Sequence, residues 1–385
     1  MTTSPNLQTG LNGDPKVEGF VNGSDLRIAV TQYDYINEPP VAQPVKVYNA
    51  ETATSVASTT WNSVKNLYTL AKLGSYLYAI DYDNALVAQI DASTYAETGK
   101  TFSLAGSGVP IPPGFKPYGQ ALIVIGSDLY GLFSFANADW TEYKNSVLVK
   151  FTIGTTITVG TNDYNNTLEK NAFSLAVYGS DIYVAAIGGK QGNGTYNPNS
   201  KVQKIAYTGT LGSATVQTVL TTSNFTGEFR DISFNSNGTA YVLYGNYNSS
   251  WQLAGKLVAI ANLGAPTVYT TVNDFSSGAN GYFWSAQYTA DNQRIWFARG
   301  NDVLLYNASS NALVTTIGIA ALAGGGLYDS LNDLSYVGAV GDTTSLRGYR
   351  SPLQASNTPR ARAARALTRG RPELTDEELQ QLADK

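Results

Sequence analysis

The chain has 385 residues, 14% of them charged, and its formal net charge of −4 gives no reason to expect nucleic-acid binding. It contains neither cysteine nor histidine, which excludes disulfides, thiol nucleophiles, thiolate or histidine metal sites and histidine-based catalytic triads. Catalysis would have to rest on carboxylates, lysine, tyrosine, arginine or a hard cation, so we expect a binding protein rather than an enzyme.

The first residues, MTTSPNLQTG, have neither the basic start nor the apolar core of a signal peptide. No apolar run approaches the roughly 20 residues that a membrane span needs. The composition is rich in Asn, Thr, Ser, Gly and Tyr, which is typical of bacterial surface or secreted proteins. We therefore expect an extracellular or cell-surface location, with Met1 standing in place of a removed signal.

A turn motif recurs along the chain. Its clear copies are NGSDLRIAV (22–30), LGSYLYAID (73–81), IGSDLYGLF (125–133) and YGSDIYVAA (178–186), whose glycines are 51, 52 and 53 residues apart. Degenerate copies are NSNGTAYVLY (235–244), TADNQRIWFA (289–298) and SLNDLSYVGA (330–339). Glycine accepts positive φ and Asp or Asn bonds the local backbone, so each copy predicts a tight hairpin between two strands, A and B.

Each copy lies in the same local pattern. An apolar run precedes it, a strand follows it, and a third run comes after a loop. A fourth run is rich in Thr and Val, as at 155–161, 215–220 and 267–272. Four short strands in about 40–50 residues, repeated, are typical of a β-propeller blade. The sequence therefore predicts an all-β fold, a single seven-bladed β-propeller of four-stranded antiparallel blades that spans residues 1–350.

Two segments add a family resemblance. DVLLYNASSNALVTTI (302–317) and ALVAQIDASTYAETGKT (85–101) each contain a strand that ends in Asp or Asn, a turn of small residues and a Val/Thr strand. This arrangement resembles the YVTN-type repeat of bacterial and archaeal surface propellers, and TAYVLYGN (239–246) is similar to the opening strand of that repeat. The resemblance implies a propeller and a cell-surface setting, and it implies no catalytic residue.

The two ends of the chain raise separate expectations. The seventh unit offers strands at 325–332, 333–340 and 344–350 but no fourth, so we expect the segment Thr2–Thr9 to close the ring; the alternative is a disordered terminus. Residues 351–385 form a linker, a basic run (360–371) and a short helix with Thr375 and Glu378 in capping-box spacing. This tail could mediate self-assembly or partner docking, and the alternative is a solvated extension.

Ligand-binding candidates lie in the loops that do not repeat. The B–C loops of blades 1, 3, 4 and 5 are long, at 32–44, 135–146, 187–200 and 245–255, and extra length is not needed to close a blade. They place aromatic rings among Asn, Gly and Ser, a mixture that suits sugar rings or protein partners. The alternative is that the rings pin their own loops. The candidates are Tyr33, Tyr35, Trp140, Tyr143, Tyr196, Tyr247 and Trp251.

Carboxylates give weaker candidates. Asp81 and Asp83 could chelate Ca²⁺, although two carboxylates fall short of a full oxygen cage, and otherwise we expect no cofactor. Arg230 and Asp231 begin an inner strand, where a salt-bridged channel lining is the simpler interpretation. The Asp-box pattern of sialidases is absent.

The sequence favours a non-enzymatic surface or secreted module that recognises a glycan or protein through the aromatic B–C loops. Two alternatives stay open. One is a carboxylate-based carbohydrate-active hydrolase or lyase, whose acids would converge in the channel mouth. The other is a structural subunit of a surface assembly, in which the tail or the loops dock neighbouring copies.

Overall fold

Short antiparallel strands account for almost all of the regular structure. The computed structural model describes residues 15–350 except 24, 35–36, 38, 51, 53, 192–193, 208, 249–251, 279–283, 290–292, 300–301, 319–332 and 336–347. In these residues one 3₁₀ turn, η1 (Leu211–Ser213), is the single helical element. The abundance of Val, Ile, Thr and Tyr explains this choice, because β-branched and aromatic side chains pack well on a pleated surface.

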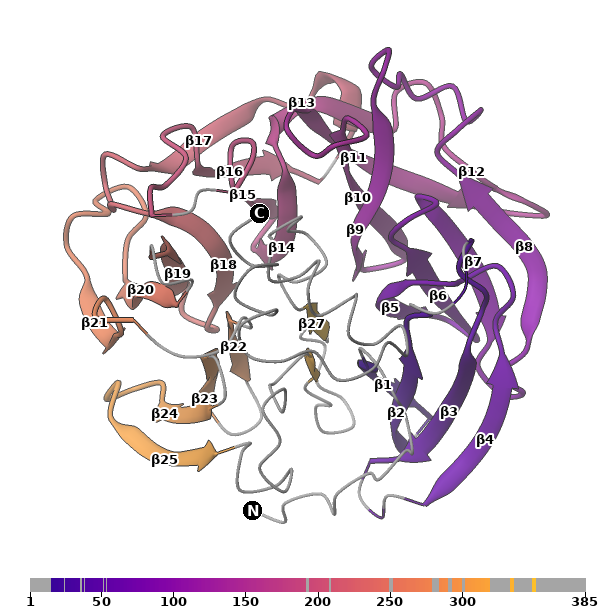
Figure 1. The fold of residues 1–385 in the computed structure, drawn as a ribbon, viewed down its shortest axis with the longest axis horizontal. Helices are drawn as coiled ribbons and strands as arrows, with labels where there is room; N and C mark the ends of the chain where they lie inside the picture. The colour runs from indigo at the N-terminus through magenta and orange to yellow at the C-terminus, as the bar shows by residue number, and fades with distance from the viewer. Residues whose placement is uncertain are drawn as a thin grey trace, which may run out of the picture.

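The strands form six successive sheets, arranged as the blades of a β-propeller (Figure 1). Blade 1 contains β1 (Pro15–Asn22), β2 (Asp25–Gln32), β3 (Pro44–Asn49) and β4 (Ser55–Thr60). Blade 2 contains β5 (Leu67–Leu73), β6 (Tyr76–Asp81), β7 (Leu86–Asp91) and β8 (Glu97–Ser103). Blade 3 contains β9 (Lys116–Ile125), β10 (Asp128–Ala136), β11 (Tyr143–Ile153), β12 (Ile157–Thr158) and β13 (Tyr164–Lys170).

The other three blades follow the same order from the inner to the outer strand. Blade 4 contains β14 (Ala172–Tyr178), β15 (Asp181–Ala186), β16 (Lys201–Ala206) and β17 (Val216–Thr221). Blade 5 contains β18 (Glu228–Phe234), β19 (Ala240–Tyr247), β20 (Leu253–Ile260) and β21 (Thr270–Asp274). Blade 6 contains β22 (Trp284–Thr289), β23 (Arg294–Arg299), β24 (Asp302–Asn307) and β25 (Leu313–Gly318).

The recurring glycine motif is the A–B turn, as predicted. Gly23, Gly74, Gly126 and Gly179 lie between the first two strands of blades 1 to 4 with φ between +59° and +66°. A Cβ at any of them would meet no atom within 4 Å. Conformation alone, and not crowding, therefore explains the glycines. The motif is structural.

The C–D turns explain the segments that resemble a surface repeat. Asp91 is the last residue of β7, and its carboxylate accepts hydrogen bonds from Ser93 N–H, at 2.8 Å, and from Ser93 Oγ, at 2.5 Å. Asn307 ends β24 and accepts the same pair of bonds from Ser309. These bonds lower the pKa of Asp91 to about 2. The similar sequences after β7 and after β24 therefore reflect the same turn geometry.

The core lies between the blades. Five clusters of buried apolar side chains each join two successive blades, from the blade 1–2 pair to the blade 5–6 pair. Trp61, which is fully buried between blades 1 and 2, donates its indole N–H to the carbonyl of Tyr95 at 2.9 Å. A four-stranded sheet cannot bury both faces alone, so each blade depends on its neighbours.

The inner strands share a local irregularity. In β5, β9, β14 and β18 the register with the next strand shifts by one residue, which leaves Tyr68, Gln120, Phe173 and Arg230 as bulged residues. A bulge bends a strand and redirects its side chains. All four lie toward the end of the strand away from the A–B turn, the end where the long loops enter.

The residue after a bulge often bonds to the next blade. Thr69 Oγ1 accepts the N–H of Leu122 at 2.9 Å, which links blades 2 and 3. Asp231 in blade 5 accepts the hydroxyl of Ser174 in blade 4 at 2.6 Å and that of Ser285 in blade 6 at 2.9 Å. These polar contacts bind neighbouring inner strands laterally, so the ring does not rest on apolar packing alone.

The predicted number of seven blades is wrong, because the structure forms six. After β25 the described residues contain only β26 (Asp333–Ser335) and β27 (Gly348–Arg350), which pair with each other. Both contact β1, and β27 also contacts β5, as its place inside the ring in Figure 1 illustrates. The error came from counting turns. Asp333 begins β26, as Asp25, Asp128 and Asp181 begin the second strands of blades 1, 3 and 4, but among the described residues only β27 follows it.

One strand within blade 3 was also misplaced. Residues 155–161 were expected to form the fourth strand, but β12 pairs with β11 over only two residues. β13 instead runs along β11, and its Leu168 is fully buried between blades 3 and 4. We attribute the pairing of β13 with β11 to the burial of Leu168, which outweighs the β-propensity of the Thr-rich segment 155–161. The segments Thr2–Thr9 and 351–385, with their predicted closing strand and tail helix, lie outside the described residues.

Candidate functional site

The loop between β10 and β11 holds its tryptophan in a fixed position. Asn137 directly follows β10, and its side-chain oxygen accepts the N–H groups of Thr141 and Glu142, each at 2.9 Å. Its carbonyl accepts the N–H of Trp140 at 3.2 Å. Trp140 itself has φ of +60°, a left-handed conformation that costs energy for any residue other than glycine. Five other non-glycine residues in the described part of the chain, among them buried Tyr95 in a C–D turn, also have positive φ, so Trp140 occupies a left-handed turn position that sets the direction of its side chain.

Trp140 packs into a cluster of tyrosines between blades 2 and 3. Its ring centroid lies 4.2 Å from that of Tyr118 and 6.1 Å from that of Tyr82, with the Tyr82 and Trp140 planes only 3° apart. Tyr68, on its bulge, lies 4.5 Å from Tyr82. Trp140 is half-buried, so part of the indole faces solvent. We name Tyr68, Tyr82, Tyr118, Trp140 and Tyr143 the aromatic cluster.

The hydroxyl groups of Tyr82, Tyr118 and Tyr143 are protonated at neutral pH. Burial raises the pKa of Tyr82 well above its ordinary value, and neighbouring tyrosines raise it further. Burial likewise raises the pKa of Tyr118 and of Tyr143, with Asp83 adding to the effect at Tyr118. The buried tyrosines thus support the indole of Trp140, which is the one half-buried ring of the cluster and offers a flat aromatic surface.

Two lysines lie over aromatic rings at the loop end of blade 3. Lys116 begins β9, and its ammonium lies 5.3 Å from the ring centroid of Tyr118. Lys144, next to Tyr143, places its ammonium 4.8 Å from the ring centroid of Phe115. Both lysines are exposed. Their alkyl stems cover aromatic surface while their charged ends reach solvent.

The seven predicted aromatic residues have different environments. Trp140 and Tyr143 lie together, with centroids 6.4 Å apart, but Tyr143 is only 7% exposed. Tyr247 is 1% exposed and belongs to the core between blades 5 and 6. Tyr33 and Tyr196 are half-buried. Tyr35 and Trp251 lie outside the described residues.

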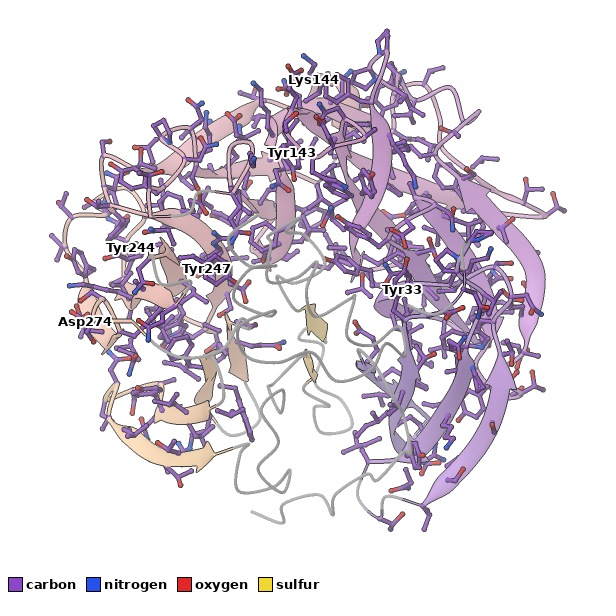
Figure 2. The ribbon with its side chains drawn as sticks, in the orientation of Figure 1. Tyr33, Tyr143, Lys144, Tyr244, Tyr247 and Asp274 are labelled. Atoms are coloured by element: carbon purple, nitrogen blue, oxygen red, sulfur yellow. The ribbon has the colours of Figure 1, made fainter. Side chains whose placement is uncertain are left out.

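The candidates do not form one patch. Figure 2 places Tyr33, Tyr143 and Tyr247 at separate positions around the ring. The loop that carries Tyr196 is tied to blade 5, because the N–H of Gly194 bonds to the carbonyl of Tyr247 at 2.9 Å. Trp140 therefore stands out among the described candidates, since it combines a half-buried ring with a rigid aromatic support.

Three members of the cluster were not predicted as site residues. Tyr68 and Tyr118 lie in inner strands, and Tyr82 directly follows β6. In the sequence Tyr68 and Tyr118 belong to strand patterns, where an aromatic residue is normally a core residue, and Tyr82 lies in the short B–C loop of blade 2. The one sequence signal that could have identified Tyr68 and Tyr118 as site residues is their distance from the A–B turn, since both lie near the loop end of their strands.

Asp81 has a structural role. Its side chain is fully buried and accepts the N–H groups of Lys65, Asn66 and Asn84 at 2.7 to 2.8 Å. Burial raises the pKa of this carboxyl, and the backbone donors oppose the shift. Asp83 accepts the side-chain amide of Asn66 at 3.0 Å. Across the described ranges no three His, Cys, Asp or Glu side chains gather closely enough to hold a metal ion.

The acids of β18 are also held by neighbours. Arg230 forms a buried ion pair with Glu228, and the other oxygen of Glu228 accepts the N–H of Asn197 at 3.0 Å. Asp231 is 4% exposed and bonds to Ser174, Ser285 and the N–H of Ala286. Arg230 was predicted beside Asp231 as a salt-bridged channel lining, but its ion-pair partner is Glu228, which was not among the predicted residues.

No family model matches the chain, and no curated protein matches it either. Among solved structures the chain is similar to regucalcin, a calcium-binding protein from Agrobacterium tumefaciens, with 10% identity, a TM-score of 0.47 and coverage of 89% of this chain and 94% of that one. A functionally unknown protein from Desulfotomaculum acetoxidans gives the same identity and TM-score, with coverage of 89% and 90%. A luciferin-regenerating enzyme is similar with 10% identity, a TM-score of 0.45 and coverage of 88% of this chain and 91% of that one.

These similarities are too low to say anything about the chemistry of this chain. The propeller assignment rests on the sheets described above, and the resemblance to YVTN-type repeats stays a prediction. The part of the chain that the structure describes contains no apolar helix of membrane-spanning length.

Proposed function

We propose that the protein is a non-enzymatic carbohydrate-binding propeller, in which Trp140 stacks on a sugar ring. The observation that supports the proposal is the conformation of Trp140, with φ of +60° and its ring laid against Tyr118 and Tyr82. A pyranose presents an apolar face of C–H groups, and a tryptophan ring offers a matching flat surface.

Preorganisation strengthens this proposal. The bonds around Asn137 fix the loop before any ligand arrives, and the tyrosines fix the indole plane. Binding then requires little ordering of side chains, which is one of the costs of forming such a contact. Exposed Asp139, Thr141 and Glu142 on the same loop supply polar groups for sugar hydroxyls.

The proposal includes an extracellular or cell-surface location, which the composition supports. A carbohydrate-active hydrolase or lyase is less well supported. Asp231, the acid predicted near the channel, is buried and bonds to neighbouring blades, and Glu228 on the same strand pairs with Arg230. A protein ligand at the same loop is the alternative outcome of the test below.

Replacement of Trp140 with alanine tests the proposal. A screen of the full chain against neutral and acidic oligosaccharides should find a ligand, and Trp140→Ala should weaken its binding at least about tenfold, because a central aromatic contact commonly contributes about 2 kcal/mol. Trp140→Phe, which keeps a smaller flat ring, should give an intermediate affinity. Calorimetric titration measures both, and product analysis should find no cleavage.

Tyr76→Ala is the matched control. Tyr76 is 36% exposed and lies beside the A–B turn of blade 2, at the opposite end of the strands from the Trp140 loop. Its removal should leave affinity unchanged. If no oligosaccharide binds, or if binding survives Trp140→Ala in a folded protein, the proposal is wrong. A peptide ligand that needs Trp140 would also contradict it.

A further inference from the structure

The end of the ring opposite the Trp140 loop carries two sets of turns. In blades 1, 2, 4 and 6 the residue after the third strand donates its N–H to a carbonyl in or beside the A–B turn: Ala50 to Leu26 at 2.9 Å, Ala92 to Ser75 at 3.0 Å, Tyr207 to Ser180 at 3.2 Å and Ala308 to Gln293 at 3.0 Å. The C–D turns therefore adjoin the A–B turns of their own blades. We name this end of the ring the turn face.

The turn face carries nearly all of the exposed apolar side chains. Among the described residues eight large apolar side chains are well exposed, and seven of them lie on this face. Tyr76 and Tyr178 flank A–B turns. Those beside C–D turns are Val56, Val268, Tyr269, Leu313 and Val314. Single exposed apolar residues are common on protein surfaces, but their concentration on one face, in five of the six blades, favours an interaction surface there.

Tyr178 has the most defined surroundings of these side chains. Its ring stacks on that of Phe234 across the junction of blades 4 and 5, with centroids 5.4 Å apart and planes at 18°. Phe234 in turn lies 4.5 Å from the ring of Tyr183. Gly238 makes room for the stack, since a Cβ there would lie 2.5 Å from the hydroxyl oxygen of Tyr178. The fold thus holds an exposed aromatic ring in a fixed position, which is typical of the central residues of interfaces.

Charges on the turn face are neutralised within their own blades. Lys72 donates to the carbonyl of Gly74 at 2.8 Å, and Asp91 accepts its bonds from Ser93. The acidic residues that begin second strands form ion pairs: Asp25 with Arg27, Asp128 with Lys150 at 2.8 Å, and Asp181 with Lys204 at 3.1 Å. An apolar surface can therefore cover this face without leaving these charges unpaired.

The Trp140 face differs in both respects. Its one well-exposed large apolar side chain among the described residues is Val41, in the B–C loop of blade 1. The charged residues around the Trp140 loop are exposed and form no ion pair in the part of the chain that the structure describes; they are Lys116, Asp139, Glu142 and Lys144. Covering them with an apolar surface would cost free energy, so the turn face is the better interface.

We infer that the turn face binds a second copy of the chain around a two-fold axis. A two-fold contact places a surface against its own copy, so a net charge would repel its partner, whereas charges that are already paired do not. A stable interface of this kind buries about 800 Å² on each partner and needs several contact points, which the exposed residues of five blades provide. The dimer presents its two Trp140 loops at opposite outer ends.

Sedimentation equilibrium of the full chain without sugar, between about 1 and 200 µM, measures the association. We expect the mass to rise from monomer to dimer, and added NaCl should not dissociate the dimer, because apolar contacts are not screened. Val268→Asp and Leu313→Asp should each weaken the dimer at least about tenfold, since a two-fold interface buries the new charge in both copies.

These two variants should fold, because Val268 is 74% and Leu313 53% exposed, and their circular dichroism and urea midpoints should match those of the parent. Tyr76→Asp is an independent third probe, in blade 2. Val41→Asp is the matched control: it adds the same charge on the opposite face, at a side chain that is 46% exposed, and should dimerise as the parent does.

Four results would overturn the inference. They are a monomer at every concentration, a dimer that survives all three turn-face variants, a dimer lost in Val41→Asp, and a dimer that NaCl dissociates. A monomer whose turn face instead binds lipid vesicles or a different protein falls under the first of these. Since the measurement contains no sugar, its failure leaves the proposed function standing, and loss of sugar binding in Trp140→Ala leaves the dimer untouched.

Discussion

Replacing Asp231 with alanine is expected to lower the free energy of unfolding by about 3 to 5 kcal/mol, because several buried donors then lose their acceptor. Asp231 is 4% exposed and accepts hydroxyl groups from Ser174 and Ser285, together with the N–H groups of Ile232 and Ala286. These partners belong to blades 4, 5 and 6. The change should therefore loosen three blades at once, and urea unfolding followed by tryptophan fluorescence measures it.

Two further variants make the result for Asp231→Ala interpretable. Asp231→Asn keeps one acceptor oxygen but turns an amide N–H₂ toward donors, so we expect a smaller loss of about 1 to 3 kcal/mol. Asp128→Ala is the surface control. Asp128 pairs with Lys150 at 2.8 Å in an exposed position, and its loss should cost less than about 1 kcal/mol. Equal losses from Asp231→Ala and Asp128→Ala would contradict the proposed lateral links.

Substitution of Gly119 should open the contact between blades 2 and 3. A Cβ at this position would lie 2.5 Å from the carbonyl oxygen of Asp81 and 2.6 Å from a side-chain carbon of Ile80. The N–H of Gly119 also bonds to the carbonyl of Tyr82 at 3.0 Å. Backbone groups cannot move aside without separating the strands, so Gly119→Ala should cost about 2 to 3 kcal/mol.

Gly154→Ala is the matched control for Gly119→Ala. Gly154 has no positive φ, and the nearest atom to an added Cβ, the carbonyl oxygen of Thr156, lies 3.8 Å away. We expect a change within about 0.5 kcal/mol. Because Gly119 lies between Gln120 and the cluster residue Tyr118, the Gly119 variant should also weaken sugar binding. Normal stability and affinity in Gly119→Ala would show that the blade contact is looser than described.

The sequence allowed much of the fold to be predicted. Glycine at φ near +60° has a strict conformational reason, so Gly23, Gly74, Gly126 and Gly179 marked real turns. The same counting failed at the seventh unit, where an Asn-Asp pair precedes β26 but only β27 follows among the described residues. A turn motif predicts one hairpin, and it does not show that a complete four-stranded blade surrounds that hairpin.

The site could be predicted only in part. Trp140 was a candidate because it lies in a loop longer than its blade needs, which is a local property of the sequence. Tyr68, Tyr82 and Tyr118 come from two blades, and nothing local distinguishes them from core aromatics. Tyr143 and Tyr247 show the opposite case, since loop aromatics that resemble ligand contacts are 7% and 1% exposed. Contacts between blades, which the local sequence does not show, decide whether each of these aromatic side chains is buried or exposed.

The indole signals of the five tryptophans test the central claim most directly. In a proton–nitrogen correlation spectrum, Trp140→Phe identifies the Trp140 signal by its loss, and Trp61, buried and bonded to Tyr95, serves as an internal reference. Added oligosaccharide should shift the Trp140 signal progressively and leave the Trp61 signal in place. A ligand that binds without moving the Trp140 signal would contradict the claim that this ring forms the sugar-binding surface.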